Sequence, residues 1–176
     1  ITNSSDLYGV VHSDSVHPIF ASYRDTVLLV DRGQKEVSST LGHNLMNGHP
    51  FSEQRFLQAQ DNLAELVTAL AEGDVNTFVR IVELEALTLH AMMMTSDPSF
   101  VLMKPNTLHI IQAVRVYRKE TGIPLCFTLD AGANVHLLYP NENAEKVMDW
   151  IENEWASYCQ NHQYIHDRVG NGAKKM

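Results

Sequence analysis

The sequence predicts an α+β domain of the ferredoxin-like type, in which helices pack on one face of a small antiparallel sheet. Three observations lead to this fold class. A compact β run at 26–30 precedes two long helical patterns, two short β-rich runs enclose a turn at 130–134, and another helical pattern follows them. At 176 residues, the chain is long enough for one domain with a proper core.

The chain opens with a poorly patterned segment and a strand. We interpret residues 1–23 as a lead-in segment from a preceding domain, and residues 24–176 as the domain itself. The start at Ile1 rather than Met indicates a piece of a longer protein. After the buried strand at 26–30, residues 31–34 turn the chain.

Two helices follow from near Ser52. Apolar residues at three- and four-residue steps define one face of the first helix. The sequence Glu72-Gly73-Asp74 ends this helix and begins the next, because glycine suits the residue after a helix and aspartate suits an N-cap. The second helix runs to about Met94, and its broad apolar stripe predicts burial.

A third helix is expected before the hairpin. Pro98 and Pro105 interrupt the helical pattern. Asn106 or Thr107 is then expected to cap a helix that ends near Gly122.

The hairpin runs are 125–129 and 135–139, and a final helix comes after them. Asn141 or Asn143 is expected to open that helix, which reaches about Tyr158. The tail beyond it could return to the sheet as a strand.

The composition is that of an ordinary globular protein, with 44% hydrophobic and 19% charged residues. The net charge of −8 argues against a nucleic-acid surface, because phosphate contacts need clustered Lys and Arg. No apolar run approaches the length of a membrane span. The two cysteines, Cys126 and Cys159, form no CxxC motif and indicate a reducing, cytoplasmic compartment.

The most informative segment is the turn inside the hairpin, Asp130-Ala131-Gly132-Ala133-Asn134. It places one carboxylate at the end of a strand, beside small residues that let a ligand approach the backbone. Gly132 can adopt a positive φ, and Asn134 tolerates one. Asp130 is therefore a candidate acid or base, although aspartate and asparagine are also ordinary turn residues.

A second candidate is the hydroxyl-rich segment at Ser38, Ser39 and Thr40, which precedes a possible helix start. Hydroxyls and the N–H groups of a helix N-terminus could bind phosphate oxygens, or the segment could simply cap a short helix. Neither a GxxxxGK[ST] nor a GxGxxG motif occurs, so the chain lacks the usual nucleotide-binding loops.

The nine histidines do not predict a metal site. His162 and His166 would share a face if that segment were helical, but the pattern supplies no third ligand. Glu83 and His90 could meet along the second helix, where structural pairing is more common than catalysis. We therefore predict no metal site in this chain.

Three segments carry a resemblance to a known family: Val37–His43, Leu87–Thr95 and Thr128–Asn134. In their order and spacing they resemble the C-terminal half of diphosphomevalonate decarboxylase, in the GHMP kinase superfamily. The likeness covers roughly residues 24–172, and the Asp-Ala-Gly segment is its most specific part.

The resemblance implies an enzyme of the mevalonate route to isoprenoids, which uses ATP and Mg²⁺ to phosphorylate the tertiary hydroxyl of mevalonate diphosphate. Loss of phosphate and CO₂ then leaves isopentenyl diphosphate. It also implies that ATP and Mg²⁺ are bound mainly by an N-terminal domain absent from this chain. The chain alone would then be inactive, and the whole protein would be a homodimer.

By this resemblance, Asp130 is the catalytic residue and faces the C3 hydroxyl, as a base or as an orienting group. Ala131 and Gly132 would keep the path to the substrate open. Ala133 departs from the family, which has proline there, and this removes a fixed φ from the turn.

The hydroxyl-rich segment is implied to bind substrate near its carboxylate or diphosphate, through Ser38, Ser39 and Thr40. Thr40 stands where some bacterial members have arginine, so one charged contact is missing or comes from elsewhere.

Two other functions remain open at this point. The first is a related GHMP kinase that phosphorylates a small molecule without decarboxylation. The second is a non-catalytic ferredoxin-like module for dimerisation or ligand sensing.

Overall fold

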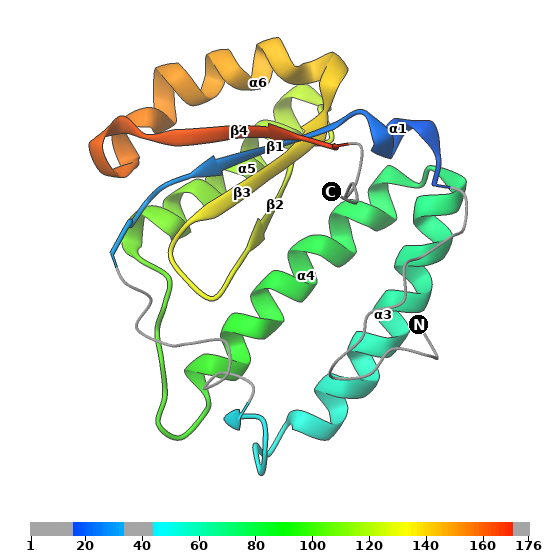
Figure 1. The fold of residues 1–176 in the computed structure, drawn as a ribbon, viewed down its shortest axis with the longest axis vertical. Helices are drawn as coiled ribbons and strands as arrows, with labels where there is room; N and C mark the ends of the chain where they lie inside the picture. Colours follow the sequence, from blue (N-terminus) through cyan, green and yellow to red (C-terminus); the bar gives the residue numbers. More distant parts are fainter. Residues whose placement is uncertain (1–15, 34–43, 171–176) are drawn as a thin grey trace, which may run out of the picture.

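The computed structural model describes residues 16–33 and 44–170, and its centre is a four-stranded antiparallel sheet (Figure 1). The strands lie in the order β2-β3-β1-β4. They are β1 (Tyr23–Leu28), β2 (Cys126–Leu129), β3 (Val135–Pro140) and β4 (Tyr164–Arg168). Strands β2 and β3 form the predicted hairpin, while β1 pairs with both β3 and β4. The predicted ferredoxin-like α+β fold is thereby confirmed.

The main core lies between the sheet and the helices α5 (Pro105–Thr121) and α6 (Ala144–Trp150). Alternate residues of each strand point to these helices, as the period of a strand requires. On the sheet side the fully buried members include Leu28, Phe127, Val135 and Leu137. On the helix side the fully buried members include Ile110, Val114, Val147 and Ile151. On the opposite face Tyr23 and Cys126 are buried as well, so only part of that face can line a cavity.

Helices α3 (Ser52–Glu72) and α4 (Val75–Met94) form an antiparallel pair beside the sheet, with α4 next to β2 (Figure 1). The predicted junction between them is confirmed. Gly73 follows α3 with a φ of 79°, and the Asp74 carboxylate accepts a hydrogen bond from the Thr77 N–H at 3.0 Å.

The predicted start of the third helix was wrong. Helix α5 begins at Pro105 itself, with Lys104 as its N-cap residue. Proline suits the first helical position because the N–H it lacks has no intrahelical acceptor there. Thr107 lies inside the first turn, where its hydroxyl accepts a hydrogen bond from the Lys104 N–H at 3.1 Å.

The last helical region is less regular than predicted. It comprises the 3₁₀ turn η1 (Asn141–Asn143), α6, the π turn η2 (Ile151–Trp155) and the 3₁₀ turn η3 (Ala156–Tyr158). Another 3₁₀ turn, η4 (Gln160–His162), leads into β4, so the tail does return to the sheet.

The described end of the lead-in segment packs against the domain. It contains the short helix α1 (Pro18–Ala21), and Phe20 is buried with its ring 4.9 Å from that of Phe78 on α4. Within the described residues, every helix is too short or too polar to cross a membrane.

Candidate functional site

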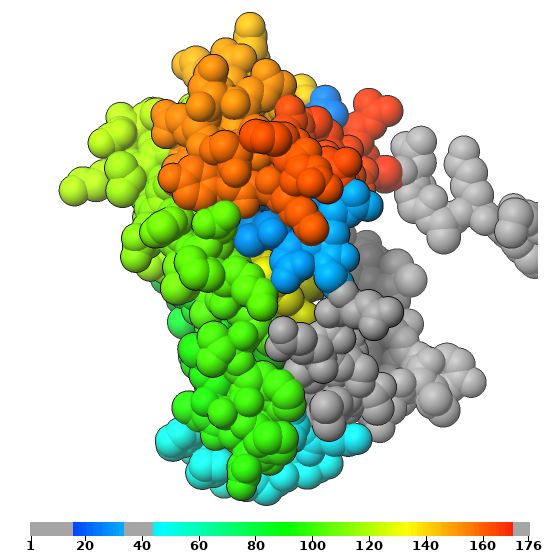
Figure 2. Space-filling model, turned by 90° about the vertical axis from the view of Figure 1, so that its left-hand side faces the viewer, coloured from blue at the N-terminus to red at the C-terminus, as the bar shows by residue number. Residues whose placement is uncertain are grey.

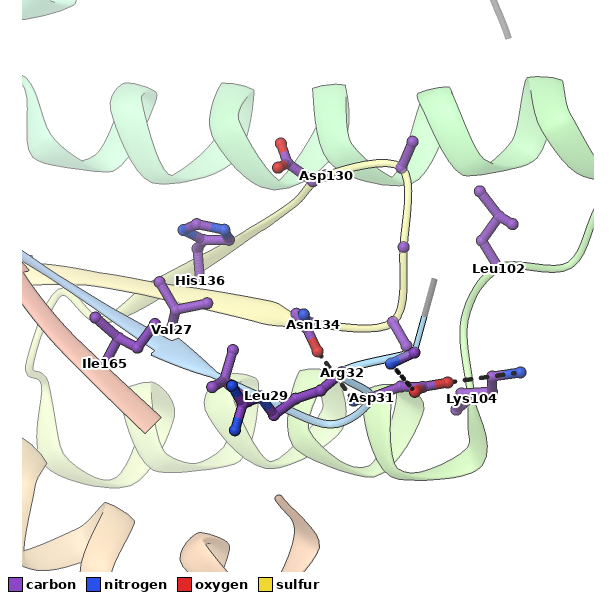
Figure 3. Close-up of a pocket in the computed structure, with 14 residues that line it drawn as sticks. Val27, Leu29, Asp31, Arg32, Leu102, Lys104, Asp130, Asn134, His136 and Ile165 are labelled. Carbon is purple, nitrogen blue, oxygen red and sulfur yellow. Dashed lines mark hydrogen bonds and ion pairs between the residues drawn. The ribbon is translucent and has the colours of Figure 1, made fainter. Parts of the chain in front are cut away.

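The hairpin turn and the end of β1 enclose a cavity of about 350 Å³, on the sheet face opposite α5 and α6 (Figure 3). Figure 2 shows the end of β1 and the segment after it, in light blue, beneath the orange and red C-terminal segment and beside yellow atoms of the hairpin. The lining comes from all these parts of the chain: Val27, Leu29, Asp31, Arg32, Gly33, Leu102, Lys104, Asp130, Ala131, Gly132, Ala133, Asn134, His136 and Ile165.

Asp130 lies directly after β2, with its backbone hydrogen-bonded and its side chain exposed. Its carbonyl accepts a hydrogen bond from the His90 Nε2 at 3.0 Å and from the Gly132 N–H at 2.7 Å. Within residues 16–33 and 44–170, the Asp130 carboxylate has no hydrogen-bond or ion-pair partner, and the residue is exposed. This arrangement fixes a reachable carboxylate at the cavity, as an acid or base requires.

Side chains from two other elements hold the rest of the turn. The buried Thr107 hydroxyl on α5 donates to the Ala133 carbonyl at 2.6 Å. The Asn134 side-chain oxygen accepts from the Asp31 N–H at 3.0 Å, which ties the turn to the end of β1. These bonds restrain the turn on both sides of the Ala133–Asn134 peptide bond.

The turn does not use the positive φ angles that Gly132 and Asn134 permit. The positive-φ residues of the described chain include neither Gly132 nor Asn134. Gly132 instead leaves space, because a β-carbon added there would have no neighbour within 4 Å among the described atoms. Ala131, which is half-buried, and Gly132 both line the cavity, so small side chains border the approach to Asp130.

His136 is a site residue that the sequence interpretation missed. Its Nδ1 lies 2.9 Å from a carboxylate oxygen of Asp25, and this hydrogen bond raises the pKa of His136 above its ordinary 6.5. The charges of Asp25 and Asp130 raise that pKa further, while partial burial opposes them. The alternation of β3 was the available signal, because it places His136 on the face opposite the buried Val135 and Leu137.

The other end of the cavity carries the remaining charged groups. Asp31 lies 4.0 Å from the Lys104 amine and also accepts a hydrogen bond from the Gly33 N–H. The Arg32 guanidinium donates a hydrogen bond to the Gln163 side chain. Figure 3 shows Asp31, Arg32 and Lys104 together at this end of the cavity. The cavity therefore has both carboxylates and cations along its wall.

The other sequence-derived candidates have different outcomes. Ser38, Ser39 and Thr40 fall outside the described residues, so their place relative to Asp130 stays a prediction. Glu83 and His90 do not pair: Glu83 binds Arg115 and Arg118 on α5.

The described residues contain no group of three or more His, Cys, Asp or Glu side chains that could hold a metal ion. His162 lies in η4 and His166 in β4, so they do not share a helix face. The His166 ring is instead 2.9 Å from the Thr26 hydroxyl.

Comparison with known proteins places the whole domain in one family. A model of the mevalonate 5-diphosphate decarboxylase C-terminal domain matches residues 26–175. The chain is 29% identical over 105 residues to a phosphomevalonate decarboxylase of Haloferax volcanii, covering 60% of this chain and 32% of the relative. It is 26% identical to a diphosphomevalonate decarboxylase of Schizosaccharomyces pombe, covering 73% and 33%.

Solved structures share the fold. A mevalonate diphosphate decarboxylase from Legionella pneumophila superposes with a TM-score of 0.76 at 26% identity, over 86% of this chain and 47% of that one. A structure described as MDDEF in complex with MVAPP, AMPPCP and magnesium gives 0.77 at 23% identity, over 88% and 46%. The chain spans about a third of the length of the curated relatives it matches. The chain belongs to the family of mevalonate 5-diphosphate decarboxylase C-terminal domains.

Proposed function

We propose that this chain supplies the C-terminal part of an ATP-dependent decarboxylase that converts mevalonate diphosphate to isopentenyl diphosphate, CO₂, ADP and phosphate. The observation that carries the proposal is Asp130, an exposed carboxylate at the cavity on the hairpin of a domain of this family. The whole protein is proposed to be a cytoplasmic homodimer, and to join this chain to an N-terminal ATP-binding domain.

Asp130 is proposed to act on the tertiary hydroxyl of the substrate. A carboxylate within hydrogen-bond reach, about 2.6–3.2 Å, can accept the hydroxyl proton or orient the oxygen for attack on the phosphoryl group. His90 and Gly132 hold the Asp130 carbonyl, so the backbone that carries the carboxylate is fixed before substrate binds. Ala131 and Gly132 leave room for the substrate, and Ser38, Ser39 and Thr40 are proposed to bind its anionic groups.

ATP and Mg²⁺ are proposed as cofactors of the whole protein, in keeping with the AMPPCP and magnesium of the related complex. The described residues offer no cluster of three metal-ligating side chains, and the sequence has no phosphate-binding glycine loop. We therefore assign both cofactors mainly to the proposed N-terminal domain.

A second candidate substrate is mevalonate phosphate, which carries one phosphate fewer. The relative from Haloferax volcanii is named a phosphomevalonate decarboxylase. The threonine at position 40 agrees with this candidate, since a monophosphate presents less negative charge than a diphosphate and needs fewer cationic contacts.

The test is ATP-dependent CO₂ release by the longest natural polypeptide that contains this chain, assayed with each of the two substrates. We expect CO₂ release, and a loss of about a hundredfold or more in Asp130→Asn, the scale of a positioned acid–base group. Asp61→Asn, which alters another exposed carboxylate on α3, is the matched control and should keep full activity.

Other outcomes would replace the proposal. ADP formation without CO₂ would make the protein a GHMP-type kinase. No ADP with either substrate would favour a non-catalytic dimerisation or sensing module.

A further inference from the structure

Asp25 and His136 form a charged pair on the same sheet face as the cavity. In the antiparallel pairing of β1 with β3, His136 lies opposite Val27, and Asp25 lies opposite Leu138. The two side chains are therefore diagonal neighbours, a distance that long polar side chains can bridge. Their 2.9 Å hydrogen bond places the imidazole ring in the wall of the cavity that Asp130 also lines.

The surroundings of this pair favour a protonated ring. One oxygen of the Asp25 carboxylate bonds to Nδ1, and the other is buried without a hydrogen-bond partner in the described chain. Asp167 on β4 lies opposite Asp25. The negative charge of Asp130, on the hairpin turn, also favours the protonated ring. The cations Arg32 and Lys104 line the cavity beyond the end of β1, where Asp31 accompanies Lys104.

The second ring nitrogen is left for a ligand. In the protonated ring Nδ1–H donates to Asp25, so Nε2–H is the remaining donor, and Nε2 has no hydrogen-bond partner among residues 16–33 and 44–170. Figure 3 draws the His136 ring and the Asp130 carboxylate on the same side of the hairpin. A cationic donor thus lies beside the carboxylate proposed to face the substrate hydroxyl.

We propose that His136 binds an oxyanion of the substrate through Nε2–H, and that Asp25 is its positioning residue. This inference rests on the function proposed above and adds a substrate-binding residue to the same site. Hydrogen bonds from a charged donor to a carboxylate or phosphate oxygen are roughly twice as strong as neutral ones, so loss of the charge should weaken substrate binding.

The test uses the full-length protein and its KM for mevalonate phosphate and mevalonate diphosphate between pH 6 and 9. We expect His136→Gln to raise KM about tenfold or more, and His136→Lys, which restores a cation, to recover most of that loss. In the natural protein, KM should rise as the pH passes the pKa of His136 and the ring loses its charge. Asp25→Asn should move this rise to lower pH, because it removes the main cause of the raised pKa of His136. His109→Gln, at an exposed position on α5, is the matched control.

A purely structural pair would behave differently. In that case His136→Gln would lower the stability of the protein but leave both KM and its pH profile unchanged. Unchanged KM values in His136→Gln would overturn the proposal.

A second measurement is independent of turnover. Histidine Cε1–H resonances of the full-length protein are followed during titration with inorganic pyrophosphate and, separately, with mevalonate. A shift of the His136 resonance with pyrophosphate alone would assign a phosphate oxygen as the ligand, and a shift with mevalonate alone would assign the carboxylate. No shift with either anion would overturn the proposal, whereas absence of CO₂ release with such a shift would reject only the proposed function.

Discussion

At the scale of single residues, two histidines lie close to Asp130, and their pKa values are shifted in opposite directions. His90 on α4 is 1% exposed, and burial lowers its pKa below 6.5. It donates Nε2–H to a carbonyl, which a neutral ring does equally well. His136 bonds to a carboxylate, and its pKa is raised. One ring therefore fixes the backbone of the turn, while the other brings charge to the cavity.

The two histidines predict opposite pH dependences of stability. His90 binds protons more weakly in the folded state, so its contribution is complete above pH 6.5 and falls as the pH drops through its lowered pKa. His136 binds protons more tightly when folded, so its contribution is complete below pH 6.5 and falls as the pH rises through its raised pKa.

Urea unfolding between pH 5 and 8.5 checks both signs. His90→Gln should flatten the acid side of the stability profile, and His136→Gln should flatten the alkaline side. If either substitution flattens the opposite side, the assigned environment of that ring is wrong.

At the scale of elements, the hairpin turn is restrained by distant side chains. We expect Thr107→Val to cost about 1–3 kcal/mol of unfolding free energy, because it leaves the buried Ala133 carbonyl without its donor and the Lys104 N–H without its acceptor. In the full-length protein it should also lower kcat, since the turn carries Asp130. Thr68→Val is the control, because that hydroxyl is exposed and bonds only to the Ala64 carbonyl of its own helix. Equal stability of the two variants would show that the hydrogen bond from Thr107 to the Ala133 carbonyl does not restrain the turn.

Two helix-ending glycines offer a matched pair of substitutions. Gly122 has a φ of 71° and no described atom within 4 Å of an added β-carbon, so Gly122→Ala should cost only the backbone strain, about 1–2 kcal/mol. Gly73 has a φ of 79°, and an added β-carbon would lie 2.8 Å from the His17 ring.

Gly73→Ala should cost about 1 kcal/mol more than Gly122→Ala, because the displaced His17 ring is the N-cap acceptor of α1. Urea unfolding of both variants measures the difference. A Gly73→Ala cost no greater than that of Gly122→Ala would mean that the His17 ring moves aside freely.

Local signals predicted most elements of this fold, and long-range contacts explain what they missed. The Gly73–Asp74 junction and the hairpin around Asp130 were readable because caps and turns depend on neighbouring residues. The partners of that hairpin, His90, Thr107 and Asp31, lie 40, 26 and 103 residues from the atoms they hold. Periodicity carries no information about such pairs, so Asp130 could be predicted but not the bonds that position it.

At the scale of the whole molecule, one continuous core joins the sheet to α5 and α6. The buried cluster includes Leu28 on β1, Ala86 on α4 and Ile151 at the start of η2. Because all these elements contribute to one apolar cluster, we expect the 176-residue chain to unfold as a single cooperative unit.

We nevertheless expect this chain to fold by itself without catalysing the reaction. Its cavity places Asp130 and His136 where substrate oxygens could reach them, but the sequence has no phosphate-binding glycine loop for ATP. We expect the purified 176-residue chain to unfold cooperatively in urea and to produce neither ADP nor CO₂ from ATP and mevalonate diphosphate. The full-length protein assayed at the same concentration is the control. Turnover by the chain alone would mean that the nucleotide site lies within these residues, and the proposed division of labour between two domains would have to be abandoned.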